Sequence, residues 1–203
     1  MSSRSERIPG RPSADEVREM VSRIIDGIVA GENGDPSPAS EEPSPRATHG
    51  KDIIAIGADH GGYPLKEKLG FRLREQGHQV IDCGTDSSKS VDYPDFAHAV
   101  AGKVASGEAR WGVIVDGAGI GSAMVASKVP GVRAALCYDL SSARNSREHN
   151  LANVLTLGAG LIGDNLAWQI VQEWLSTDWG GDRHARRVDK ITEIERRYSK
   201  SAT

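Results

Sequence analysis

Residues 113–123, VIVDGAGIGSA, combine residue types that could do chemistry. Three β-branched residues lead into Asp116, and glycines follow at positions 117, 119 and 121. Glycines let a ligand approach the backbone, and amides at the start of a helix can hold an anion. A carboxylate beside such amides could take a proton from a carbon next to a carbonyl while the amides stabilise the enediolate oxygen. The segment therefore predicts an enolising enzyme with Asp116 as its base.

Three other interpretations of this segment stay open. Asp116 could cap the helix that follows. Close packing of the backbone alone could require the glycines. A dinucleotide-binding turn also contains glycines, but its spacing is G-x-G-x-x-G, whereas this turn reads G-x-G-x-G and follows the third predicted strand.

Alternating strand and helix patterns predict the framework that positions this turn. Strands are expected at residues 52–57, 78–84, 111–116, 132–138 and 153–158. Helices are expected at residues 64–77, 94–106, 121–128, 140–148, 164–175 and 184–199. Strands with apolar runs that alternate with helices indicate a parallel sheet covered by helices. Ligands bind beyond the carboxyl ends of such strands, so we expect the polar residues that follow the strands to converge there: Asp59, His60, Tyr93, His149 and Asn150.

The amino-terminal part of the chain has a different pattern. Residues 1–31 form an extension with one predicted amphipathic helix, in which Ser13 and Glu16 have the spacing of a capping box. Apolar residues recur at helical spacing on one stripe: Val17, Met20, Val21, Ile24, Ile25, Ile28 and Val29. Residues 32–50 are rich in Pro, Ser and Glu, which predicts a flexible, disordered linker before a domain over residues 51–203.

Composition excludes several classes of partner. The formal net charge of −3 over 203 residues gives no reason to expect nucleic acid. No apolar run approaches the ~20 residues that span a bilayer, so no membrane is expected. Cys83 and Cys137 lack disulfide or metal-ligand spacing, which favours free thiols and a cytoplasmic protein.

Four further motifs occur in order between about residue 52 and residue 198: GADHGGYPLKEKL, DCGTDSSKSVDYPDFA, SREHNLANVLTLGA and GGDRHARRVDKI. In these motifs the chain resembles the ribose-5-phosphate isomerase B and galactose-6-phosphate isomerase family of sugar-phosphate isomerases. The resemblance implies a Rossmann-like three-layer α/β/α fold around a five-stranded parallel sheet. It implies a homodimer, or a tetramer of paired dimers, with active sites shared across the interface. It also implies that no metal or cofactor is needed.

The resemblance assigns roles to individual residues. His149 would open the sugar ring, and four residues would hold the sugar: Asp59, His60, Tyr93 and Asn150. The backbone of Gly117, Ala118 and Gly121 would stabilise the enediolate. Three basic residues would lie toward the phosphate: Arg183, His184 and Arg187. The spacing of the two arginines supports this independently, because residues four apart share a helix face and could fork a phosphate.

Four positions depart from the family pattern. Asp116 stands where the family usually has a cysteine base, and Ser122 stands where another branch has a glutamate. Ala118 replaces a usual threonine, and Gly160 replaces a usual phosphate-binding arginine. Ribose 5-phosphate and ribulose 5-phosphate are the expected pair. The alternatives are another sugar phosphate, such as a tetrulose phosphate, or a weakly catalytic sugar-phosphate-binding or compartment component.

The predicted helix of residues 13–31 needs a partner, because a short helix is marginal alone in water. It could dock on its own domain or on a second copy; association with a membrane is a weaker interpretation, because acidic residues outnumber basic ones there. An amphipathic helix, a linker and then an enzyme also resemble the layout of encapsulation peptides on cargo of bacterial microcompartments. That resemblance implies shell proteins as partners and a location inside such a compartment.

Overall fold

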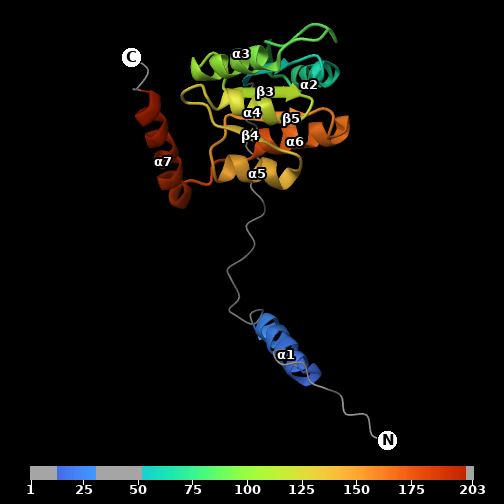
Figure 1. The fold of residues 1–203 in the computed structure, drawn as a ribbon, viewed down its shortest axis with the longest axis vertical. Coiled ribbons are helices and arrows are strands. Elements are labelled where there is room, and N and C mark those ends of the chain that lie inside the picture. Colours follow the sequence, from blue (N-terminus) through green and yellow to red (C-terminus); the bar gives the residue numbers. More distant parts are fainter. Residues whose placement is uncertain (1–12, 31–51, 200–203) are drawn as a thin grey trace, which may run out of the picture. The chain divides into compact units, whose positions relative to one another are not determined.

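The computed structural model describes residues 13–30 and 52–199 and divides the chain into two compact units, residues 1–45 and 46–203 (Figure 1). The predicted linker at residues 32–50 lies outside the described residues. In the first unit, helix α1 spans Ala14–Ala30. Its predicted capping box is confirmed, because the N–H of Ser13 donates to Glu16 Oε2 at 2.6 Å and the N–H of Glu16 donates to Ser13 Oγ at 3.2 Å. Val17, Met20 and Val21 of the predicted stripe are exposed within this unit.

The second unit contains one parallel sheet, as predicted. Its strands are β1 (Ile53–Ala58), β2 (Gln79–Asp82), β3 (Trp111–Asp116), β4 (Ala134–Leu136) and β5 (Val154–Gly158), in the order β2-β1-β3-β5-β4. The helices are α2 (Tyr63–Glu75), α3 (Tyr93–Ala105), α4 (Ile120–Ala126), α5 (Leu140–Glu148), α6 (Asp164–Ser176) and α7 (Asp182–Ser199). The edge strands β2 and β4 are shorter than predicted, and each pairs with a neighbour on one side only.

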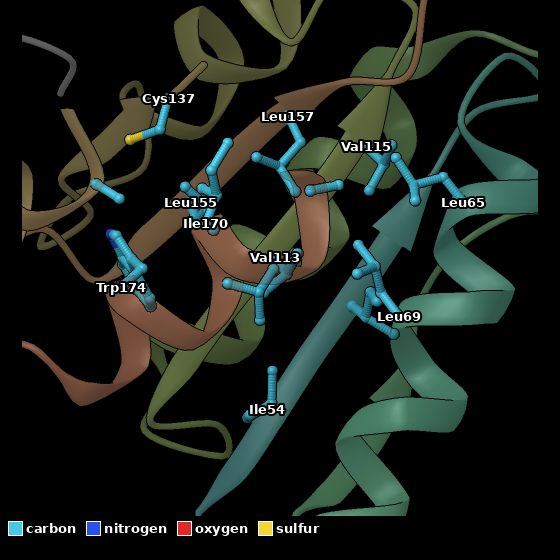
Figure 2. Close-up of a cluster of buried hydrophobic side chains, with 14 of the residues drawn as sticks. Ile54, Leu65, Leu69, Val113, Val115, Cys137, Leu155, Leu157, Ile170 and Trp174 are labelled. Carbon is cyan, nitrogen blue, oxygen red and sulfur yellow. The ribbon is translucent and has the colours of Figure 1, made fainter. Parts of the chain in front are cut away.

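Two apolar clusters fill the space between the sheet and its helices, which gives three layers. Figure 2 shows the larger cluster, in which side chains of α2 and α6 meet those of β1, β3 and β5. On the other face, α3 and α4 cover the sheet through Val100 and Ala126, which pack with Ala55 and Ile114. Residues of β3 are buried throughout, as expected for a central strand of a doubly covered sheet. The predicted Rossmann-like α/β class is therefore confirmed.

The strand order creates a switch point between β1 and β3. The chain passes from β1 outward to β2 and returns to β3 on the other side of β1. Connections that leave adjacent strands in opposite directions open a crevice at the carboxyl ends of those strands. The loops after β1 and β3 are therefore the expected position of a ligand. Among the described residues, no helix has the length and apolar character to cross a membrane.

Candidate active site

The loop after β1 places Asp59 and His60 at the carboxyl edge of the sheet. Asp59 is buried, and its Oδ1 accepts hydrogen bonds from the N–H groups of Gly61 at 2.9 Å and Gly62 at 3.0 Å. Nδ1 of His60 lies 3.2 Å from both the N and the O of Val91. The imidazole is thereby held at one ring nitrogen while its side chain stays partly exposed.

The glycine turn follows β3 beside that loop. Gly119 has a φ of 77°, and a Cβ at this position would lie 2.5 Å from a leucine side chain of β4, so the turn requires glycine. Oη of Tyr138 donates to the carbonyl of Ala118 at 2.8 Å, and the N–H of Gly160 donates to the carbonyl of Gly117 at 2.9 Å. A Cβ built on Gly117 would meet open space. The turn is therefore fixed by its neighbours and leaves room for a ligand at Gly117.

Tyr93, the first residue of α3, lies across the same turn. A Cβ added to Gly121 would lie 2.6 Å from two ring carbons of Tyr93 and 2.8 Å from its Oη. The ring therefore packs directly on the backbone of Gly121. The structure thus brings residues from β1, α3 and the glycine turn to one place, as the sequence predicts.

Asp116 ends β3 and points back into the protein. Its side chain is nearly buried, and Oδ1 accepts hydrogen bonds from the N–H groups of Ala118, at 2.8 Å, and Gly119. Oδ2 accepts from both the N–H, at 3.2 Å, and the hydroxyl of Ser122. The carboxylate therefore caps the start of α4, which is the arrangement that the capping interpretation predicts. One of the three amides expected to hold the enediolate, that of Ala118, is occupied by this carboxylate.

The expectation that His149 and Asn150 converge with Asp59 on one edge is wrong. Both residues follow the carboxyl end of α5, and this helix of nine residues runs back about 14 Å along the sheet. Beside them, Arg147 stacks on Trp111, the first residue of β3, with its Cζ 4.0 Å from the ring centroid. Asp116 is the last residue of β3, about 16 Å away along an extended strand. In one chain, His149 and Asp116 therefore lie at opposite edges.

A second polar group gathers around His149 at this other edge. Nδ1 of His149 lies 2.8 Å from Nδ2 of Asn145, one helical turn earlier. Nδ2 of Asn150 lies 3.3 Å from Oδ1 of Asn145. The side-chain amide of Asn145 therefore fixes both residues that the resemblance places on the sugar.

His184 packs against His149 instead of standing free. Their rings are stacked, with centroids 4.2 Å apart and planes 11° apart, and His184 is buried. Nε of Arg183 donates to Nε2 of His184 at 2.9 Å, so this ring nitrogen acts as an acceptor and the ring is neutral. Burial lowers the pKa of His184, and the neighbouring His149 and the positive charges of Arg183 and Arg187 lower it further. This position suits support of His149 better than direct contact with a phosphate.

Arg183 and Arg187 are exposed on the first two turns of α7, on either side of His184 in sequence. Their effect on the pKa of His184 places both positive charges in its neighbourhood. An anion bound by these arginines would lie close to His149. The structure thus places the arginines predicted to bind phosphate beside His149, the residue predicted to open the ring. Both lie apart from the glycine turn of the same chain.

Three residues near these groups were not predicted. Asn145 could have been found from its i, i+4 spacing to His149. Tyr138 is the last residue of a predicted strand, but nothing in the sequence indicates its bond to the glycine turn. Trp179 lies edge-on to His184 with ring centroids 6.2 Å apart, in a segment without a periodic pattern.

Comparison with known proteins assigns this architecture to a family. Residues 54–191 match the Ribose/Galactose Isomerase family. The chain belongs to that family. Its relatives in the family include ribose-5-phosphate isomerase B of Escherichia coli K12, which is 45% identical over 144 residues that span 71% of this chain and 97% of the relative. The ribose-5-phosphate isomerase B of Mycobacterium tuberculosis is 36% identical over 147 residues, 71% of this chain and 91% of the relative.

Solved structures of the family agree. The chain matches Clostridium thermocellum ribose-5-phosphate isomerase B with a TM-score of 0.71 and 51% identity, over 72% of this chain and 99% of the other. The Mycoplasma genitalium enzyme, solved with bound ribulose-5-phosphate, matches with a TM-score of 0.69 and 38% identity, over 71% of this chain and 96% of the other. Membership of this family makes the chain a sugar-phosphate aldose–ketose isomerase.

Proposed function

We propose that this isomerase interconverts ribose 5-phosphate and ribulose 5-phosphate through an enediolate. The observation that carries the proposal is the meeting of Asp59 and His60, Tyr93 and the glycine turn at the switch point between β1 and β3. These groups offer a carboxylate, an imidazole, a phenol and backbone amides around an open space at Gly117. The names of the relatives in Escherichia coli and Clostridium thermocellum support the same substrate.

In this mechanism the sugar ring first opens, with His149 transferring the proton between the ring oxygen and the C1 hydroxyl. A base then removes the C2 proton of the aldose, and the electrons move into the enediolate. The hydroxyl proton on O2 moves to O1, and the proton taken from C2 returns to C1 to give the ketose. Asp116 is our candidate base. It must release one of its four hydrogen bonds to accept that proton. If Asp116 serves only as a cap, Asp59 is the next carboxylate at this edge, with its Oδ2 turned toward His60 at 3.9 Å.

We also propose that each complete site forms between two copies of the chain. One copy would supply the glycine turn, and the other would supply His149, Arg183 and Arg187, since one chain holds these groups at opposite edges. Exposed apolar side chains support pairing: those of Ile191, Ile194 and Tyr198 on α7 are 46–74% exposed. They line a groove of about 840 Å³ beside β4. A second copy is the occupant that would both cover this groove and complete the site.

A second candidate substrate is indicated by Gly160, after β5, and by Ala118 of the glycine turn. Gly160 has no side chain to reach a phosphate, and a Cβ there would lie 3.0 Å from the carbonyl of Gly117. Ala118 has no hydroxyl to offer the sugar. Losing one charge-assisted contact weakens binding by roughly 1.5–3 kcal/mol. A different sugar phosphate, such as a tetrulose phosphate, therefore competes with the pentose as the preferred substrate.

Solvent proton exchange tests the reaction and its substrate together. The full-length protein is incubated in D2O with a panel of tetrose, pentose and hexose phosphates, and deuterium at the carbon next to the carbonyl is followed by NMR. We expect exchange and interconversion to be fastest with the pentose pair. Faster exchange with a tetrulose phosphate would make that sugar the preferred substrate instead of the pentose. Absence of exchange with every sugar would contradict the proposed isomerase reaction.

For helix α1 we propose a shell protein of a bacterial microcompartment as partner. The capping box of Ser13 and Glu16 fixes the start of the helix, and Val17, Met20 and Val21 lie exposed within its unit. A fusion of residues 1–31 to a fluorescent protein should co-sediment with shell proteins, and the same fusion with M20E should not. Loss of residues 1–50 should leave turnover in dilute solution unchanged. A wild-type fusion that stays in the supernatant contradicts this proposal.

A further inference from the structure

Arg147, on the last turn of α5, is buried against two indole rings. It is 5% exposed, and its Cζ lies 4.0 Å from the ring centroid of Trp111 and 5.2 Å from that of Trp174. The two indoles meet edge to face with centroids 5.4 Å apart (Trp174 is labelled in Figure 2). Burial lowers the pKa of Arg147 to about 10, aided by the charge of Arg110, so the guanidinium stays charged at neutral pH. A buried cation stacked on aromatic faces has a fixed position.

The guanidinium holds the turn that follows α5. Its Nη1 donates to the carbonyl of Ala152 at 2.6 Å, and Nε of Arg133 donates to the carbonyl of Leu151 at 2.9 Å. Leu151 has a φ of 51°, a left-handed conformation that is disfavoured for residues with a Cβ. Two successive carbonyls of this strained turn are therefore each held by an arginine. Nε of Arg147 has no hydrogen-bond partner within residues 52–199, whereas Nη1 is held by the Ala152 carbonyl and the guanidinium by the aromatic stack.

This turn begins with His149 and Asn150. Its shape therefore sets where the imidazole of His149 and the amide of Asn150 lie relative to α5. We propose that Arg147 is a positioning residue for ring opening: it holds residues 149–152 in the conformation that presents His149 and Asn150 to the sugar. This inference rests on the proposed isomerase function. It does not require Arg147 to touch the substrate.

The two substrates of the proposed reaction separate this role from general stability. Ribose 5-phosphate closes into a furanose and must be opened before a proton can leave C2. Ribulose 5-phosphate cannot form the five-membered ring, because its C5 oxygen carries the phosphate. Exchange of its C1 proton with solvent therefore needs the base and the enediolate site but not ring opening. At saturating substrate, where a weaker Asn150 contact limits neither process, a defect in positioning His149 should slow the first process and spare the second.

The experiment compares full-length R147K with the wild-type protein in both assays. Lysine keeps the positive charge but cannot stack as a plane or reach Ala152 with the same geometry. We expect turnover of ribose 5-phosphate to fall by at least about 10-fold, and C1 exchange in ribulose 5-phosphate to stay within about 2-fold. R144K is the matched control, because Arg144 lies on the same helix, is exposed and pairs with Glu173. It should change neither rate.

A second variant tests the route through Leu151. Glycine adopts a positive φ without strain, so L151G combined with R147Q should recover part of the turnover that R147Q alone loses. The positioning role is overturned if R147K loses turnover of ribose 5-phosphate and C1 exchange of ribulose 5-phosphate equally, and if R147Q combined with L151G recovers no turnover. If the wild-type protein catalyses no exchange, the proposed function itself fails. The NMR signal of the His149 ring then decides the inference: it should shift in R147K and not in R144K, and an unchanged signal overturns it.

Discussion

Asp116 is the residue at which chemistry and folding compete most directly. Its carboxylate accepts four hydrogen bonds from the turn that it precedes, and three of these come from backbone amides. The sequence could not separate a cap from a base, because both need a carboxylate at the same position of the same turn. The structure shows the capping contacts. Only a variant that keeps the shape and removes the charge can separate the two roles.

For D116N we expect turnover to fall by at least ~10²-fold, the usual contribution of a positioned base. Asparagine is itself a good capping residue, so the free energy of unfolding should change by no more than ~1 kcal/mol. The measurements are deuterium exchange and urea unfolding of the same preparation. S122A, which removes the hydroxyl donor to Asp116, is the matched control and should retain most of the exchange. Exchange that survives in D116N would assign Asp116 to the cap alone.

His184 predicts a pH-dependent stability at the same scale. Because its pKa in the folded protein lies below the ordinary value of 6.5, the unfolded chain binds the proton first as the pH falls. Its contribution to stability is therefore complete above pH 6.5 and is lost below it. The urea concentration at the unfolding midpoint of the wild-type protein should decrease when the pH is lowered from 7.5 to 5.5. The midpoint of H184F should decrease less. H98Q, at an exposed histidine of α3, should follow the wild-type curve; identical curves for H184F would contradict this assignment.

At the scale of elements, the contact between α3 and the glycine turn makes a prediction about Gly121. In G121A, the new methyl group would lie 2.6 Å from the ring of Tyr93 and must displace it. We expect kcat/KM to fall by about 10-fold or more, and we expect Y93A to add little further loss in the double variant, since both changes remove the same contact. G102A on α3 is the control, because its methyl group meets nothing within 4 Å. Additive losses would show that Tyr93 and Gly121 act independently.

The elements themselves could be predicted well, because their signals are local. The alternation of apolar strands and capped helices gave α5 its observed bounds and gave the other described elements within a few residues. The position of His149 was predicted wrongly. Residues after the fourth strand were expected at the carboxyl edge of the sheet, but α5 runs back along the sheet and places His149 at the opposite edge. The stacked position of His184 was also missed, because no local pattern connects α7 or Trp179 to His149.

At the scale of the whole molecule, the separation of the two groups predicts complementation between inactive variants. In a 1:1 mixture of D116N and H149N, dissociated and reassociated, a mixed pair would contain one site with both changes and one with neither. Half of the pairs are mixed, so the mixture should recover about a quarter of the wild-type activity. Native mass spectrometry of the mixture measures the exchange of copies. No recovery despite proven exchange would show that one chain builds its whole site.

The opposite placement of His149 and Asp116 has a consequence for how such an enzyme behaves at low abundance. If two copies build each site as proposed, its specific activity should decline on dilution, with a midpoint at the dissociation constant of the pair, even while every chain stays folded. Newly synthesised chains would remain inactive until they associate with a second copy. Any cellular structure that raises their local concentration would therefore raise the activity per chain without a change in any side chain.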